Sequence, residues 1–159
     1  MPSTDRKRKL RVAVIGGGDC TDDQAALARE VGAELARHSC MVITGGLGGI
    51  MAAACAGARS EGGLTVGILP GFSAGEANEY VDLPIVTGLS HARNALVVRS
   101  ADGIVAVGGR YGTLSEIALS LNMGIPVVGL DSWEIDGMEK VGTAREAVGR
   151  ILQLIAERS

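Results

Sequence analysis

Aromatic residues are scarce in this 159-residue sequence, since phenylalanine, tyrosine and tryptophan together make up 3% of it. Proteins that bind single-stranded nucleic acid use aromatic side chains as stacking platforms and basic grooves to follow the phosphates. The formal net charge of -3 shows that the basic surface is missing as well. We therefore expect no nucleic-acid partner.

Long apolar runs and paired cysteines are also missing. No apolar run approaches the ~20 residues that a membrane-spanning helix needs, so we expect no membrane segment. The three cysteines, Cys20, Cys40 and Cys55, are odd in number and show no CxxC spacing. The sequence therefore predicts neither a disulfide framework nor a metal site, and it suits the reducing cytoplasm.

Glycine, in contrast, is abundant: 24 of the 159 residues are glycine, about twice the average usage of ~7%. The length is that of about one domain. We expect residues 1–10 to form a flexible basic leader and residues 11–159 to form a single domain.

Short apolar segments alternate with helical patterns along that domain. A capping box at Thr21 and Gln24 predicts the start of the first helix, and Ser90 is the expected cap of a helix over 90–100. Pro84 makes a strand near 81–86 irregular or places it at a sheet edge. The other strands are expected at 10–18, 40–46, 64–71, 102–109 and 125–130, and the other helices at 49–63, 112–124 and 144–156. The alternation predicts an α/β, Rossmann-like, doubly wound parallel sheet with helices on both faces.

Three sets of glycines follow predicted strands directly. In a doubly wound sheet, ligands bind beyond the carboxyl ends of the strands, at the point where the winding reverses. Several glycine sets on that one edge favour a ligand that approaches the backbone closely. The candidate binding glycines are Gly16, Gly17, Gly18, Gly45, Gly46, Gly108 and Gly109.

Familiar glycine motifs do not fit these positions. A GxGxxG pattern from Gly16 would need glycine where Thr21 stands, and no P-loop lysine is present. The lysines Lys7, Lys9 and Lys140 lie away from the glycine edge, which argues against a lysine Schiff base and pyridoxal chemistry.

The segment GGRYGT opens a predicted helix. Free backbone N–H groups and the helix dipole favour an anion there, and Gly112 and Thr113 are expected to receive a phosphate. A second interpretation stays open, because Thr113 and Glu116 have the spacing of a capping box that merely starts the helix.

Arg93 is expected in the first turn of a helix, where a cation opposes the dipole and therefore suggests an anionic partner. That partner is ligand phosphate, Glu116 or Asp102, and a structural salt bridge is the alternative. Arg93 and Glu116 near a phosphate site also have the chemistry to stabilise the oxocarbenium-like transition state of glycosidic cleavage. Asp19 and Asn94 are weaker candidates for the same pocket.

Singletons elsewhere fit structural roles better. His91 near a helix start is interpreted as a capping or surface residue, and His38 closes a helix. Met123 and Trp133 are interpreted as packing or subunit-contact residues. The loop over 72–80 is expected to carry ligand specificity, which the sequence does not reveal.

The segments ITGGLGGIMAAACAGA and VGGRYGTLSE, with the pair Arg93 and Asn94 between them, resemble the LOG proteins, long labelled lysine decarboxylases, and the related molybdenum-cofactor carrier proteins. The resemblance spans Val12 to Leu130. It implies a Rossmann-like fold, a homodimer or homotetramer, and no pyridoxal cofactor. LOG enzymes cleave nucleoside 5'-monophosphates, cytokinin forms included, to free base and ribose 5-phosphate, with catalytic residues that match Arg93 and Glu116.

Two departures distinguish this sequence from the LOG enzymes. Val107 stands where they have proline, and Ala92 and Asn94 replace an acidic and a basic neighbour of the arginine. These departures favour the carrier branch. The expected function is therefore binding of a phosphorylated nucleotide-like ligand, either AMP-like or the phosphorylated pterin of molybdenum cofactor, with no further cofactor required. The alternative is a phosphoribohydrolase, and a structural oligomer with a vestigial site is a third hypothesis.

Overall fold

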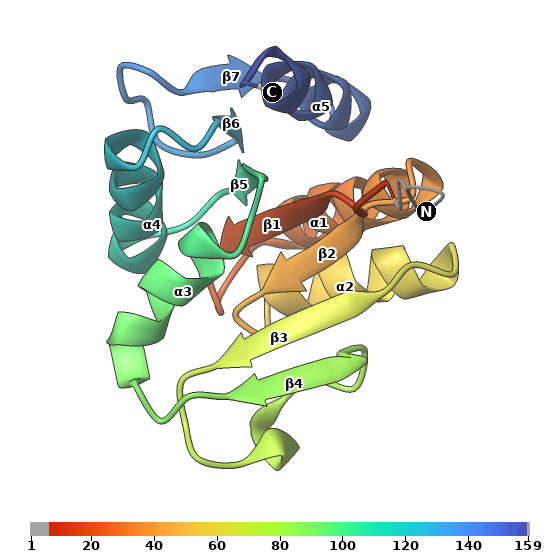
Figure 1. Ribbon diagram of the computed structural model, residues 1–159, viewed down its shortest axis with the longest axis vertical. Helices are drawn as coiled ribbons and strands as arrows, with labels where there is room; N and C mark the ends of the chain where they lie inside the picture. The colour runs from red at the N-terminus through yellow and green to blue at the C-terminus, as the bar shows by residue number, and fades with distance from the viewer. Residues whose placement is uncertain (1–6, 159) are drawn as a thin grey trace, which may run out of the picture.

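In the computed structural model, which describes residues 7–158, seven parallel strands form one sheet in the order β4-β3-β2-β1-β5-β6-β7 (Figure 1). The strands are β1 (Arg11–Gly16), β2 (Met41–Thr44), β3 (Thr65–Leu69), β4 (Leu83–Val86), β5 (Gly103–Val107), β6 (Val127–Leu130) and β7 (Glu139–Val141). Every neighbouring pair is parallel, which confirms the predicted α/β class. β4 lies at an edge, where Pro84 costs no ladder hydrogen bond.

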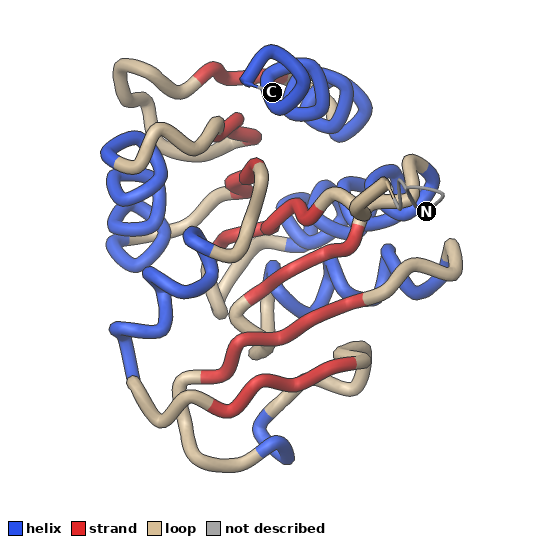
Figure 2. Tube along the Cα trace, in the orientation of Figure 1, coloured by secondary structure: helices blue, strands red, loops and turns tan. Residues whose placement is uncertain are grey.

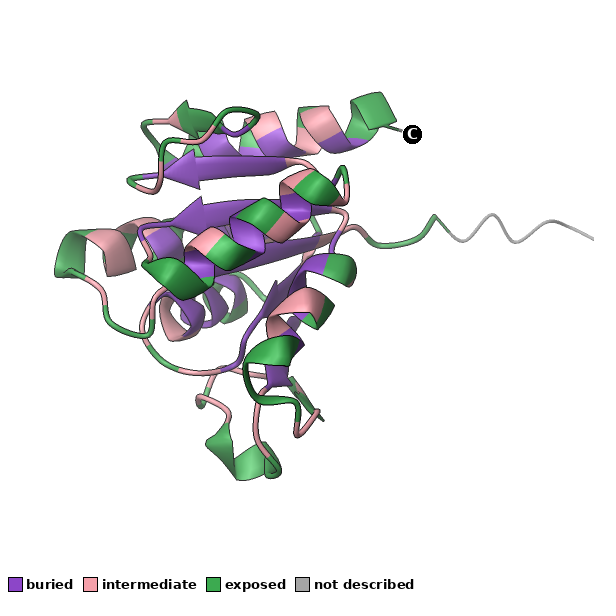
Figure 3. Ribbon diagram, turned by 90° about the vertical axis from the view of Figure 1, so that its left-hand side faces the viewer, coloured by how far each residue is buried: buried purple, intermediate pink, exposed green. Residues whose placement is uncertain are grey.

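Helices cover both faces of the sheet (Figure 2). They are α1 (Asp22–Arg37), α2 (Ile50–Ser60), α3 (Arg93–Arg99), α4 (Tyr111–Asn122) and α5 (Ala144–Arg158). One apolar core joins the sheet to α1, α2 and α5, and a second core joins the opposite face to α3 and α4. Figure 3 shows how the buried residues concentrate in the sheet between these layers. Buried valine and isoleucine runs are what a sheet covered on both faces requires.

The winding of the sheet reverses between β1 and β5. The chain moves outward from β1 to β4, then crosses back to place β5 on the other side of β1. These two strands pair from Val12 with Gly103 to Gly16 with Val107. Their carboxyl ends therefore lie at one edge, where ligands of open α/β sheets bind.

The predicted capping box at the start of α1 is confirmed. The backbone amide of Gln24 donates to the Thr21 hydroxyl at 3.1 Å. The side-chain oxygen of Gln24 accepts from the backbone amide of Thr21 at 3.1 Å. His38 is the C-cap of the same helix, as expected. α5 continues to Arg158, two residues beyond the predicted end.

The prediction that Ser90 caps a helix over 90–100 is wrong. Residues Ser90–Ala92 form a 3-10 turn, and α3 begins only at Arg93, with Ala92 as an N-cap that provides no side-chain hydrogen bond. Ser90 has a φ of 53°, and its amide donates to the Pro70 carbonyl at 2.9 Å. That hydrogen bond ties Ser90 to the loop after β3, so its backbone is unsuited to an N-cap.

Two glycines bring α1 and α2 into close contact. A Cβ on Gly32 would lie 2.8 Å from the Ala54 carbonyl carbon, and one on Gly57 would lie 2.8 Å from the Arg29 carbonyl carbon. α2 is rich in small residues and contacts the sheet as well, but these backbone approaches are to α1.

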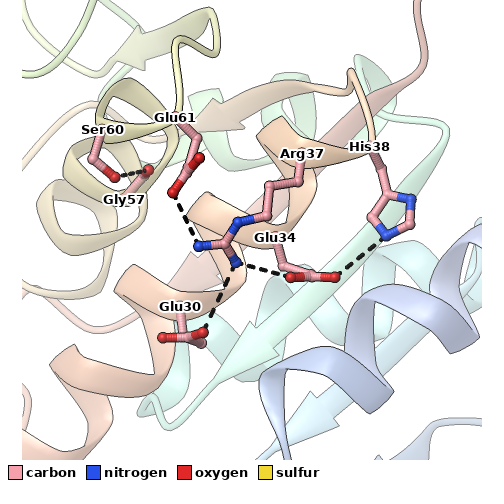
Figure 4. A network of polar contacts seen from close by, with 7 residues as sticks. All are labelled: Glu30, Glu34, Arg37, His38, Gly57, Ser60 and Glu61. Atoms are coloured by element: carbon pink, nitrogen blue, oxygen red, sulfur yellow. Dashed lines mark hydrogen bonds and ion pairs between the residues drawn. The ribbon is translucent and has the colours of Figure 1, made fainter.

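Charged side chains line the same pair of helices (Figure 4). Arg37 of α1 donates to Glu34 at 2.9 Å and to Glu61, just beyond α2, at 3.0 Å. His38 lies 3.3 Å from Glu34. The hydrogen bond from Arg37 lowers the pKa of Glu34. Because exposed ion pairs contribute little, the glycine contacts are the stronger determinant of this packing.

We predict that Gly57→Ala lowers the free energy of unfolding by about 1–3 kcal/mol, since the added methyl group overlaps the backbone of α1. Gly149→Ala in α5 is the matched control, because a Cβ there meets no atom within 4 Å. The control is expected to be neutral or stabilising. Urea denaturation of both variants measures the difference, and equal midpoints would contradict it.

Candidate functional site

A pocket of about 470 Å³ lies beyond the carboxyl ends of β1 and β5. Its volume falls within the range of small-molecule sites. The loop after β1, the loop after β2 and the starts of α3 and α4 all contribute to it. The lining residues are Val14, Ile15, Gly16, Gly17, Gly18, Asp19, Gly45, Met51, Arg93, Asn94, Arg110, Gly112, Thr113 and Glu116.

Most of the predicted site residues line this pocket. They are Gly16, Gly17, Gly18, Gly45, Arg93, Gly112, Thr113 and Glu116. Asp19 and Asn94, the weaker candidates, line it too. His91 does not, and it is exposed, in agreement with the surface interpretation.

Three predicted glycines, Gly46, Gly108 and Gly109, shape the loops around the pocket and do not line it. The Gly46 amide donates to the Thr44 hydroxyl at 3.0 Å, which closes the turn after β2. Gly108 and Gly109 have φ values of 57° and 101°, a left-handed pair that turns the chain from β5 into α4.

Gly18 and Gly112 differ from these turn glycines. A Cβ built on either residue meets no heavy atom within 4 Å, so the protein's own packing does not demand glycine at these two positions. Both residues line the pocket. The missing side chains leave the backbone open to a ligand.

The start of α4 rejects the capping-box interpretation of Thr113 and Glu116. Arg110 is the N-cap and supplies no side-chain hydrogen bond, and the helix begins at Tyr111. Thr113 therefore lies inside the first turn and cannot be an N-cap. Within residues 7–158 no side chain provides a cap hydrogen bond to this turn, where the positive end of the helix dipole lies at the pocket.

Arg93 begins α3, as expected, and is 9% exposed. One guanidinium nitrogen donates to the Gly45 carbonyl at 3.4 Å, and the other donates to the side-chain oxygen of Asn94. Its Nε is buried and has no hydrogen-bond partner among the residues that the structure describes. Burial lowers the pKa of Arg93, and Glu116 opposes this shift. Gly45 makes room for the side chain, because a Cβ there would lie 2.7 Å from Arg93 Nη2.

Glu116 lies one turn into α4 and is 7% exposed. Burial raises its pKa to about 7, and the Arg93 charge opposes this rise. Both residues are described, yet they form no direct ion pair within 4.0 Å. A substantial fraction of Glu116 is therefore protonated near neutral pH. The pocket is therefore lined by a buried cation and by a buried carboxyl group that binds a proton near neutral pH.

Asp102 is not the anionic partner of Arg93. It accepts hydrogen bonds from the two terminal nitrogens of Arg8, at 3.1 and 2.9 Å, and from the Arg11 amide at 2.9 Å. These contacts lie at the opposite, amino-terminal edge of β1 and β5. Of the expected leader, residues 1–6 lie outside the described residues.

Sequence reasoning missed Arg110 and Met51 as lining residues. Arg110 stands between the glycines of GGRYGT, so its place in that motif was an available signal. Met51 follows the glycine loop into α2 and looks like any core methionine in the sequence.

Metal and membrane sites are not found in the part of the chain that the structure describes. Within residues 7–158, no group of three or more His, Cys, Asp or Glu side chains is placed to hold a metal ion. The same residues contain no helix that is both long and apolar enough to cross a membrane.

The parallel sheet, its winding reversal and the pocket at that point define a Rossmann-like α/β protein of the ligand-binding kind. Comparison with known families narrows this class. The chain belongs to the SLOG cluster4 family, whose sequence profile matches residues 9–155.

Individual relatives agree with this assignment. An uncharacterized protein of Archaeoglobus fulgidus is 42% identical over 140 residues, which cover 87% of this chain and 92% of that protein. A probable cytokinin riboside 5'-monophosphate phosphoribohydrolase of rice, Oryza sativa, is 37% identical over 93 residues. The match covers 57% of this chain and 41% of the rice protein.

Solved structures include a molybdenum cofactor binding protein from the phototrophic bacterium Rippkaea orientalis. It has a TM-score of 0.89 and 31% sequence identity, and the match covers 94% of this chain and 99% of that one. This similarity confirms the fold. Together with the rice relative, it identifies the chain as a LOG-like ligand-binding protein.

Glu116 gives the stability of the protein a specific pH dependence. The unfolded chain releases this proton near the ordinary pKa of 4.5, whereas the folded chain holds it to about pH 7. Between these values the folded state binds more protons, so the free energy of unfolding falls as pH rises. The contribution is fully present below pH 4.5 and is lost as pH rises through 7.

We predict that Glu116→Gln stabilises the protein at pH 8 by up to about 3 kcal/mol and has little effect at pH 4.5, because the amide carries no charge to desolvate. Urea denaturation at both pH values measures this change. Glu79→Gln, at an exposed glutamate, gives the baseline. The same stability difference at both pH values would show that burial of the charge is not its cause.

Proposed function

We propose that the protein binds a phosphorylated, nucleotide-like ligand, with the phosphate at the first turn of α4. The observation that carries this proposal is the convergence of three features in one pocket. The uncapped helix start carries positive potential, Gly112 leaves its backbone open, and Arg93 Nε is buried without a partner. A phosphate supplies the acceptor oxygens that all three lack.

The ligand class we favour is a phosphorylated pterin, as in molybdenum cofactor, with an AMP-like nucleotide as the other candidate. The similarity to the Rippkaea orientalis protein supports the pterin. In this proposal the Gly112 and Thr113 backbone and the Thr113 hydroxyl hold the phosphate, Gly17, Gly18 and Gly45 allow close approach, and no other cofactor is required. Gly46, Gly108 and Gly109 support the loops that present these groups.

A second function, hydrolysis of nucleoside 5'-monophosphates, is favoured by the Arg93 and Glu116 pair. Ionised Glu116 beside a ribose stabilises positive charge as the glycosidic bond breaks, and its raised pKa allows it to exchange a proton near neutral pH. Arg93 orients the phosphate or base. The similarity to the rice phosphoribohydrolase supports this alternative.

We also propose that the protein acts as a homodimer or homotetramer. Apolar side chains are exposed on the edge strand β4 and on the outer face of α3, where a partner subunit would cover them. They include Leu83, Ile85, Val86 and Leu96, at 52%, 43%, 44% and 39% exposure.

Filling the open glycine at the phosphate site is expected to weaken binding without harming the fold. Gly112→Ala places a methyl group at the phosphate-binding backbone and is predicted to lower affinity for ribose 5-phosphate roughly tenfold or more. Isothermal titration calorimetry measures this change, with Gly149→Ala as the matched helical control. Unchanged affinity in Gly112→Ala would show that the phosphate does not bind at this position.

Incubation with AMP separates the two functions. A binding protein returns AMP intact on chromatography, while titration still detects the complex. A phosphoribohydrolase releases adenine and ribose 5-phosphate, and Glu116→Gln then lowers the rate by about 100-fold or more. Adenine release that survives Glu116→Gln would exclude this residue from the chemistry.

A further inference from the structure

The loop after β2, residues 45–49, has almost no side chains with which to hold its own shape. We call it the glycine loop, since its sequence is GGLGG, and Gly46 and Gly49 adopt left-handed φ values of 79° and 62°. Glycine has the greatest backbone freedom of all residues, so such a loop keeps one conformation only if other groups hold it. Its conformation matters because Gly45 lines the pocket and accepts a hydrogen bond from Arg93. The groups that hold the glycine loop therefore also set the surroundings of Arg93.

Thr44, the last residue of β2, holds the first peptide group of this loop. Its hydroxyl accepts from the Gly46 amide at 3.0 Å and lies 3.5 Å from the Cys55 sulfur, and the residue is fully buried. The Gly46 amide and the Gly45 carbonyl belong to one planar trans peptide group, so they point in opposite directions. The hydroxyl therefore directs the Gly45 carbonyl toward Arg93, whose Nη2 donates to it at 3.4 Å.

Asn78 holds the next two peptide groups. Its side-chain nitrogen donates to the Gly46 carbonyl at 3.3 Å and to the Leu47 carbonyl at 2.9 Å, and its backbone amide donates to the Gly46 carbonyl at 2.8 Å. Its side-chain oxygen accepts from the Tyr80 amide at 2.9 Å, so both polar atoms of the side chain are engaged. None of residues 72–80, all of which the structure describes, lines the pocket. Asn78 therefore influences the site only through the glycine loop.

We propose that Thr44 and Asn78 are positioning residues that hold the Arg93 guanidinium in place through the glycine loop. Together they fix three consecutive peptide groups, and the first of these carries the carbonyl that accepts from Arg93. Of the other guanidinium nitrogens, Nη1 donates to Asn94, the next residue of α3, and Nε has no partner among the described residues. The Gly45 carbonyl thus ties the guanidinium to a segment outside α3.

This positioning serves the ligand if Arg93 contacts its phosphate, and in that respect the inference rests on the proposed function. The two terminal nitrogens of Arg93 each donate one hydrogen bond to the protein, which fixes the direction of the remaining N–H groups. A side chain that is already held in place loses less conformational freedom when an anion binds. Loosening the glycine loop is therefore expected to weaken binding although no group that contacts the ligand is removed.

Nuclear magnetic resonance of the ligand-free, isotope-labelled protein observes the Arg93 Nε–H and tests the positioning directly. Its resonance, identified by its loss in Arg93→Lys, is expected to be sharp near neutral pH, because buried N–H groups exchange slowly with water. Thr44→Val keeps the side-chain shape but removes the acceptor, and Asn78→Asp keeps the acceptor but removes both donors. Each variant is expected to shift and broaden the resonance. Thr44→Ser retains the hydroxyl and is expected to restore the wild-type resonance.

Calorimetric titration with ribose 5-phosphate measures whether this positioning serves the ligand. Thr44→Val and Asn78→Asp are each expected to weaken binding roughly fivefold, the effect of about one hydrogen bond. Thr87→Val is the matched control. The Thr87 hydroxyl also accepts from a backbone amide, that of Leu89 at 3.2 Å, in a loop that does not line the pocket. This control is expected to leave the Arg93 resonance and the affinity unchanged.

The two measurements separate failure of the positioning from failure of the proposed function. An unchanged Arg93 resonance in Thr44→Val and Asn78→Asp would overturn the positioning, whether or not ribose 5-phosphate binds. A disturbed resonance with unchanged affinity would support the positioning and overturn its link to the ligand. If the wild type binds neither ribose 5-phosphate nor AMP, the proposed function fails, and the resonance still decides the positioning. If circular dichroism shows that Thr44→Val folds poorly, Asn78→Asp, at a half-buried residue, decides the same question.

Discussion

The buried charges of Arg93 and Glu116 are the constraint around which the pocket is arranged. Both side chains are buried near the starts of α3 and α4. Among the described residues, neither is neutralised by a direct ion pair. Burial of charge without close pairing is unfavourable, so the two apolar cores must offset its cost. Gly45 leaves room for the Arg93 side chain, and the left-handed turn at Gly108 and Gly109 precedes α4, the helix that carries Glu116. The site therefore lowers the stability of the protein locally, and the rigid sheet compensates for this loss.

Much of the fold was predictable because the sequence repeats one simple pattern. Buried β-branched runs end in glycines, and helices follow them, so the parallel sheet and the edge that carries the pocket could be derived from the sequence alone. The residues that line the pocket were predictable to the extent that they belong to those glycine loops or to the start of a helix. Arg93 was identified because a cation is unfavourable in the first turn of a helix, and Glu116 because it is a carboxylate near the predicted phosphate site.

Open alternatives and errors both arose where one sequence signature fits two structures. Thr113 and Glu116 have capping-box spacing, but the helix starts at Tyr111, because the left-handed pair Gly108 and Gly109 has already completed the turn. Serine is a common N-cap residue, but the Ser90 amide donates a hydrogen bond to the distant loop after β3, and this bond determines its backbone conformation. Glycines that shape turns and glycines that line the pocket cannot be distinguished in the sequence. They differ only in the atoms that surround their Cα atoms. Such tertiary information is absent from local spacing.

The hydrogen bonds of Arg8 to Asp102 have a practical consequence for handling the protein. They hold the beginning of the described chain at the amino ends of β1 and β5. The pocket lies at the carboxyl ends, which are the arrowheads of these strands in Figure 1. β1 is six residues long, so roughly 20 Å of sheet separates the two edges. Immobilisation on a sensor surface through residues 7–10, which precede β1, therefore leaves the pocket facing the solution.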